Sequence, residues 1–167
     1  MPNGSGVPLR YPRRPPANAF ADQCAVLEGD STVEVVFLDS RAQAVLFRMV
    51  VDRGPPLNDA LVGHAANFLE ACLKWMSDKN VSVQAPAASP TPAQLGEVKP
   101  LSANVFRISR VGTEGVLEGF YASPMALLAA GQPNAPVKRV DLEAVCNIPL
   151  SLSTLVGVLV KLKEIAG

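Results

Sequence analysis

The chain has 167 residues, of which 49% are hydrophobic, and its 15 basic residues balance its 15 acidic residues. This length can bury the core of one or two small domains. A net charge of zero gives no global field that would attract nucleic acid or a membrane surface. Because no apolar run reaches about 18 residues, we also expect no membrane span.

Residues 1–21 form a segment rich in proline and arginine, with no acidic side chain. Such a composition cannot bury enough apolar surface to fold alone, so we predict a disordered tail. Residues 11–16 favour an extended polyproline conformation. The alternative is a docking peptide that uses Tyr11, Arg13 and Arg14 to bind a partner protein or a neighbouring subunit. Nucleic-acid binding through three arginines is the weakest alternative.

Residues 22–78 predict a first βββα unit. Strands are expected at 24–28, 31–38 and 43–51, because runs rich in β-branched and other apolar residues lie there between turn residues. A helix capped by Asn58 or Asp59 is expected to run to about residue 77. One apolar stripe marks the face of this helix that covers a sheet, and it consists of Leu61, Ala65, Phe68, Leu69, Cys72, Trp75 and Met76.

Residues 79–102 are rich in proline and alanine and show no periodicity. We predict an extended, mobile linker that divides the chain almost evenly.

Residues 103–167 predict a second βββα unit. Strands are expected at 105–111, 116–121 and 137–147, the first two joined by a hairpin with Gly112 and Gly115 at the ends of its turn. In the third strand apolar residues alternate with charged ones, which is typical of a sheet with one solvated face. Between the last two strands, residues 124–130 could form a short helix or a loop that reaches over a neighbour.

The final helix is expected to begin at Pro149, because proline is favoured at the first helical position. Its apolar residues spread over roughly 220° of the helical wheel, whereas covering one sheet needs a stripe of only about 100°. A second apolar surface must therefore contact this helix. Either the other half of the chain supplies it, or a subunit interface does, formed by Leu152, Leu155, Val158, Leu159, Leu162 and Ile165.

The predicted fold class is therefore α+β: two βββα halves, with antiparallel sheets covered by helices on one face. The two halves share element order and length but little sequence identity. We favour internal duplication around a pseudo-twofold axis, and coincidence is the alternative.

The sequence predicts no catalytic, metal or cofactor site. Its only histidine, His64, lies at the flank of an apolar stripe, and a zinc site would need about four nitrogen or sulfur ligands. No phosphate-binding glycine loop or nucleophile elbow occurs. Three widely spaced cysteines, Cys24, Cys72 and Cys146, indicate buried reduced thiols in a cytoplasmic protein.

Residues 103–106 (Ala-Asn-Val-Phe), 115–121, 137–140 (Val-Lys-Arg-Val) and the helix after Ile148-Pro149 form a pattern that resembles a family of small bacterial proteins of unknown function. Those proteins are about one such unit long and often carry Ser-Pro where this chain has Ile-Pro. Antiparallel strands followed by a helix are also similar in architecture to the export chaperone SecB. Neither resemblance implies catalytic residues.

We expect a non-enzymatic protein that binds, scaffolds or assembles other proteins as a homo-oligomer, without cofactors. One alternative is a SecB-like holdase, which would expose large apolar patches. The other is an enzyme or small-ligand binder, which would enclose a pocket with perturbed titratable groups.

Overall fold

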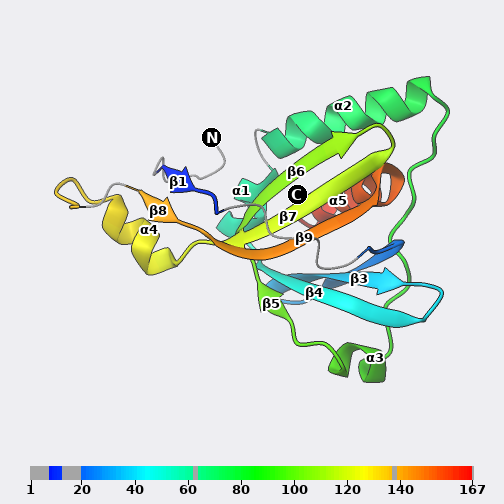
Figure 1. Cartoon of the computed structure of the whole chain (residues 1–167), viewed down its shortest axis with the longest axis horizontal. Coiled ribbons are helices and arrows are strands. Elements are labelled where there is room, and N and C mark those ends of the chain that lie inside the picture. Colours follow the sequence, from blue (N-terminus) through cyan, green and yellow to red (C-terminus); the bar gives the residue numbers. More distant parts are fainter. Residues whose placement is uncertain (1–7, 13–19, 62–63, 137–138, 167) are drawn as a thin grey trace.

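The computed structural model describes residues 8–12, 20–61, 64–136 and 139–166. They form antiparallel sheets packed with helices, which confirms the predicted α+β class (Figure 1). Two sheets carry the fold, with strand orders β2-β3-β4-β5 and β6-β7-β9. We call them the first sheet and the second sheet.

The first half folds as three antiparallel strands followed by two helices. Its elements are β2 (Gln23–Glu28), β3 (Thr32–Asp39), β4 (Ala44–Asp52), α1 (Pro55–Leu61) and α2 (His64–Asp78). Two helices therefore stand where one was predicted, and the first begins at Pro55, where the ring of proline suits an initial helical position. Gly54 precedes it with a φ of 94°, a value that a side chain would strain.

The second half repeats this order with an insertion. Its elements are β6 (Val105–Val111), β7 (Glu114–Tyr121), α4 (Pro124–Ala130), β8 (Val140–Asp141), β9 (Glu143–Ser151) and α5 (Leu152–Ala166). The predicted third strand at 137–147 is corrected: residues 137–138 lie outside the described part, and the rest is divided into β8 and β9. Val140 and Leu142 pack in one cluster and Cys146 in another, so they do not share one face.

The start of the last helix is also corrected. Pro149 lies within β9 and pairs with Val116, and α5 begins only at Leu152. Since β9 is an edge strand of the second sheet, it tolerates a residue without an N–H group.

Several corresponding elements of the two halves match in length, and the two middle strands also match in register, which supports the duplication hypothesis. β3 and β7 have 8 residues each, β4 and β9 have 9, and α2 and α5 have 15. In both sheets the register shifts after the sixth residue of the middle strand, between Phe37 and Leu38 and between Gly119 and Phe120. A bulge at the same place in both halves is difficult to explain by shared class alone.

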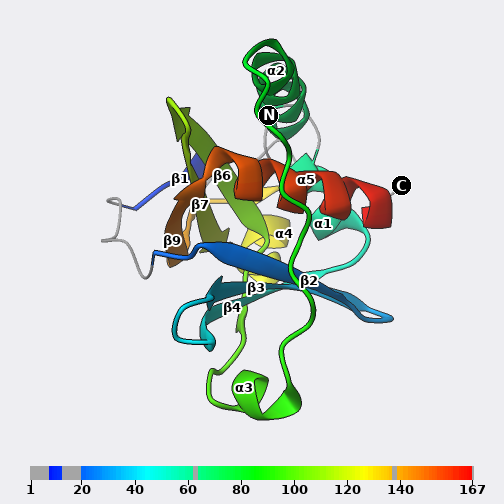
Figure 2. The same ribbon diagram turned by 90° about the vertical axis from the view of Figure 1, so that its right-hand side faces the viewer.

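α5 lies in the middle of the core, where it contacts β2 of the first sheet, β7 and β9 of the second, and α1 and α2 (Figure 2). The side chains assigned to a subunit interface are therefore already covered by their own chain. Leu152, Leu155, Val158, Leu159 and Leu162 are at most 7% exposed, and Ile165 is half-buried against the same core. This corrects the interface hypothesis for these residues: the first half supplies the second apolar surface.

Residues 79–102, which we call the crossover segment, are extended up to Pro90 but are not the mobile linker that was predicted. The main chain of the segment is held at intervals: Gln84 N–H donates to Ser153 O (3.3 Å), and Ala87 N–H donates to Cys24 O (2.7 Å). α3 (Pro92–Gly96) follows, with a capping box formed by Thr91 and Gln94.

The end of the crossover segment covers the outer face of the first sheet. Arg48 pairs with Glu34 (Nη2–Oε1 2.9 Å) and donates from Nη1 to the carbonyl oxygens of Leu95 and Val98, both at 2.9 Å. β5 (Leu101–Ser102) then adds to β4 in parallel. Leu95 and Val98 also pack on the buried residues of this face, and composition alone revealed none of these contacts.

Candidate functional site

The outer face of the second sheet, opposite α5, carries a row of polar side chains on three neighbouring strands. Arg107 on β6, Glu118 on β7 and Asn147 on β9 are cross-strand partners. Glu118 is fully buried and Asn147 is 6% exposed, although a solvated face was predicted for this side of the sheet. A buried carboxylate must be compensated by charge and hydrogen bonds, so this row needs a structural or functional reason.

The carboxylate of Glu118 is held by both neighbours. The Arg107 guanidinium donates from Nε to Oε1 (3.0 Å) and from Nη2 to Oε2 (3.3 Å), and Asn147 Nδ2 donates to Oε2 (3.2 Å). This bidentate ion pair between Arg107 and Glu118 fixes the plane of the guanidinium. The guanidinium thus presents its flat face to whatever lies above the sheet.

The side chain above the sheet is Tyr11 from the N-terminal segment. Its ring centroid lies 4.7 Å from Arg107 Cζ and 5.0 Å from the ring of Phe120, with the two rings nearly perpendicular (83°). Both contacts are favourable for an aromatic ring, the first by cation–π attraction and the second by edge-to-face packing. Burial is the main reason that the pKa of Tyr11 is raised; Glu118 raises it further, and Arg107 opposes the shift.

The main chain of the same segment is bound as an added strand. β1 (Leu9–Arg10) pairs in parallel with β8, and the N–H groups of Val140 and Leu142 donate to the carbonyl oxygens of Pro8 and Arg10, both at 3.0 Å. Leu9 packs beside Tyr11 on a buried apolar cluster, whereas Arg10 is exposed. The segment therefore alternates buried and exposed side chains as a bound extended peptide does.

β8, which we call the docking strand because the N-terminal segment pairs with it, belongs to a projection. We call this projection the arm; it is made of residues 122–136 and 139–142 (Figure 1, left). Ser123 caps α4 by accepting a hydrogen bond from Ala126 N–H, and Pro124 occupies the first helical turn. The arm is joined to the body through an apolar cluster formed by Val105, Phe120, Ala122, Ala130, Val140 and Leu142. Of the two predictions for residues 124–130, the helix is the one observed.

Of the three predicted docking residues, the structure describes only Tyr11. Tyr11 does dock, but on its own chain, and residues 8–12 are ordered, which corrects the prediction of a disordered tail for this stretch. Arg13 and Arg14 lie outside the described residues. Sequence reasoning missed Arg107, Glu118 and Asn147. The available signal was Glu118 itself, a charge between Val116 and Phe120 on an otherwise apolar strand face.

The three cysteines are free and buried, which confirms the predicted burial of these thiols. Burial raises the pKa of Cys24 and of Cys146 to about 12, and raises that of Cys72. Cys146 Sγ lies 3.8 Å from Met49 Sδ, a contact that joins the two sheets. Such thiols pack as small hydrophobic groups, because the reactive thiolate is disfavoured in an apolar surrounding.

These thiols predict a loss of stability at alkaline pH. Above about pH 9 an unfolded chain ionises Cys24 and Cys146, while the folded chain keeps them protonated, so the unfolded state is favoured as pH rises towards 12. Each thiol is expected to lower the free energy of unfolding by about 1 kcal/mol from pH 9 to pH 10. Urea unfolding at pH 7, 9 and 10 measures the effect.

The control for that measurement is the Cys24→Ala/Cys146→Ala variant. It should be less stable at pH 7, because it leaves cavities, but its stability should fall less steeply with pH. Equal slopes for the variant and the natural chain would contradict the assignment of the alkaline loss to these thiols.

The described part of the chain also bears on metal binding and on membrane insertion. No three histidine, cysteine, aspartate or glutamate side chains gather there in a way that could hold a metal ion, and the side chain of His64 lies outside that part. Among the described helices none has both the length and the apolarity needed to cross a membrane.

Comparison of the chain with protein-family models, curated proteins and solved structures found no match. The resemblances to small bacterial proteins and to SecB therefore stay predictions.

Proposed function

We propose that this chain is a non-enzymatic protein-binding and assembly protein that acts as a homo-oligomer, and that it binds extended segments on the outer face of the second sheet. One observation carries the proposal: residues 8–12 are held there in the way that peptide-binding domains hold a ligand. Main-chain hydrogen bonds to β8 supply affinity, and the contacts of Tyr11 with Arg107 and Phe120 supply specificity.

The chemistry of the site supports binding better than catalysis. To act as a general base, the carboxylate of Glu118 would need an oxygen free to accept a proton from a substrate. Both oxygens of Glu118 instead accept hydrogen bonds from fixed neighbours. The ion pair thus positions the guanidinium against an aromatic ring. The free, buried thiols support a reducing compartment, so we place the protein in the cytoplasm.

Neither alternative is favoured by a specific observation. A holdase would present one broad apolar surface, but the exposed large apolar side chains lie on separate elements, as with Leu73 on α2, Val111 on β6 and Met125 on α4. A small-ligand binder would enclose its ligand. A depression of about 460 Å³ lies between β2, the crossover segment and α5, but it is open to the surface. The charged side chains at its rim, Lys161 and Glu164, already pair with each other at 3.9 Å, so it does not favour a small-ligand site.

The test is binding of a labelled synthetic peptide with the sequence of residues 7–14 to the full-length chain. The chain's own segment competes for the site, so the Tyr11→Ala chain should bind the peptide about tenfold more tightly than the natural chain. The matched control is Arg10→Ala, which alters the exposed neighbour and should leave the affinity unchanged. A peptide carrying alanine in place of Tyr11 should bind at least tenfold more weakly.

Fluorescence anisotropy gives these affinities directly. A short peptide with one aromatic anchor is expected to bind with a Kd between about 1 μM and 1 mM. If neither the natural nor the Tyr11→Ala chain binds the peptide at millimolar concentration, the outer face is not a peptide site and the proposal fails.

A further inference from the structure

We propose that the segment of residues 8–12 is exchanged between two copies of this chain, so that each copy fills the Tyr11 site of the other and the two form a homodimer. This inference rests on the proposed function and names its partner: a second copy.

All described contacts of the segment in the site can be made equally by a segment from another chain. They are two main-chain hydrogen bonds to β8, the cation–π contact of Tyr11 with Arg107, its edge-to-face contact with Phe120, and the packing of Leu9 on the same cluster. The local contacts are then the same in the closed monomer and in the exchanged dimer. The balance between the two forms depends on protein concentration and on any extra surface that the dimer buries.

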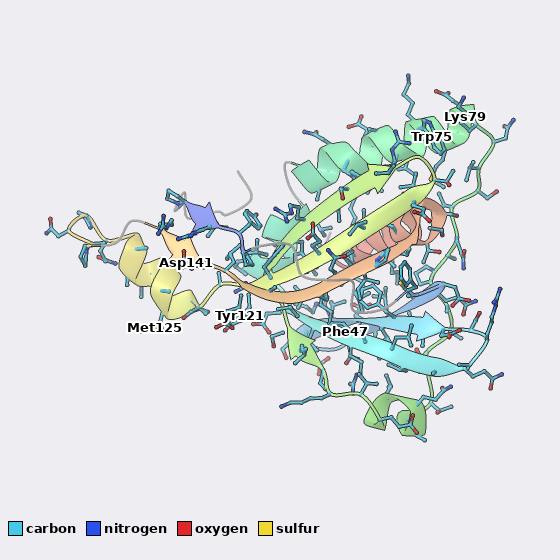
Figure 3. All side chains as sticks on the ribbon, viewed as in Figure 1. Phe47, Trp75, Lys79, Tyr121, Met125 and Asp141 are labelled. Atoms are coloured by element: carbon cyan, nitrogen blue, oxygen red, sulfur yellow. The ribbon has the colours of Figure 1, made fainter. Side chains whose placement is uncertain are left out.

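The extra surface lies on the arm. Met125 and Leu128, three residues apart on α4, are 73% and 62% exposed, and α4 packs on β8, the strand that receives the segment. In Figure 3 Met125 and Asp141 lie on the arm, well apart from Phe47 and Trp75 in the body. The closed monomer therefore leaves two large apolar side chains exposed on the arm.

Chain connectivity brings the donor copy to that surface. Seven residues join Pro12 to Phe20, so a donor segment docked on β8 holds its own Phe20 within about 30 Å of the acceptor's arm. Phe20 is itself 80% exposed and starts the described part of the body. An exchanged dimer thus keeps the body of one copy within that distance of the other copy's arm, where Met125 and Leu128 are exposed.

A pair of introduced cysteines can distinguish exchange from closure. Arg10 and Asp141 are paired across β1 and β8 and both are exposed, so Arg10→Cys and Asp141→Cys should leave the core intact. Neighbouring strands lie about 4.8 Å apart, within the Cα separation that a disulfide tolerates. The three natural thiols are buried, so they should not compete during mild oxidation.

The experiment mixes full-length Arg10→Cys chain with full-length Asp141→Cys chain, oxidises the mixture and separates it on a non-reducing gel. Exchange predicts a linked species of twice 17.6 kDa, at least tenfold more abundant than in the control mixture. The control pairs Arg10→Cys with Arg139→Cys, an exposed position on the same arm that is not its strand partner. Adding Tyr11→Ala to the Arg10→Cys chain should abolish the linked species.

Exchange is overturned if the mixture stays at 17.6 kDa while the double variant Arg10→Cys/Asp141→Cys closes an internal disulfide. Peptide binding to the Tyr11→Ala chain would in that case still support the proposed site. Equal linking in the test and control mixtures would also overturn exchange, since it shows random collision. Absence of peptide binding would remove the proposed function as well, so the two failures are separable.

Discussion

Replacing Gly157 by alanine is expected to lower the free energy of unfolding by about 3 kcal/mol, although alanine is the better helix former by about 1 kcal/mol. A Cβ at this position of α5 would lie 1.8 Å from the carbonyl oxygen of Gln84. The crossover segment is fixed at that point by hydrogen bonds to Ser153 and Thr154. Relief of the clash therefore requires movement of main chain, which costs more than rotation of a side chain.

The matched control is Gly96→Ala at the end of α3. A Cβ there meets nothing within 4 Å, so the expected change is below about 0.5 kcal/mol. Urea unfolding of both variants followed by circular dichroism gives the comparison. A Gly157→Ala chain as stable as the natural one would mean that the crossover segment does not lie against α5 in solution.

Replacing Arg107 by methionine is expected to cost about 3 kcal/mol, because the charge that pairs with it is deeply buried. The side chain of Glu118 is only 1% exposed, whereas that of Arg107 is 38% exposed. Glu118→Leu should cost less than Arg107→Met, since the guanidinium that it leaves behind can reach water. The double variant should be close to Glu118→Leu alone, because it leaves no unpaired charge in the sheet.

The control is Arg139→Met, which breaks a pair with Asp141 in which both side chains are more than half exposed. That change should cost less than about 0.5 kcal/mol. The Arg107→Met chain should also lose the contact with Tyr11, so it should bind the segment peptide more weakly than the Tyr11→Ala chain does. Equal stability losses for Arg107→Met and Glu118→Leu would contradict the asymmetry of burial.

The sequence predicted regular strands well where apolar and polar residues alternate. The three strands of the first half differ from their predicted bounds by no more than one residue at each end, because runs of β-branched and other apolar residues end there at turn residues. Pro149 shows where local rules are insufficient. Proline suits both a helix start and an edge strand, and only the position of β9 in the sheet decides between them.

The two proline-rich segments were the least predictable parts of the chain. Composition indicated that residues 8–12 and 79–102 could not form a core by themselves. It carries no information on whether another part of the chain offers free main-chain groups to bind them. β8 and Cys24 O provide those groups, and the Arg48 and Arg107 guanidinium groups complete the attachment.

The amino-acid sequence alone predicted the α+β class and the burial of the three cysteines, because these depend on periodicity, turn residues and residue chemistry. Tertiary structure decided which elements cover α5 and that Tyr11 packs on Arg107 and Phe120. A wide apolar face shows that a second surface must exist, but its identity depends on contacts between residues far apart in the chain. The first half supplies that surface, and the site of Tyr11 is the surface that we propose for a partner.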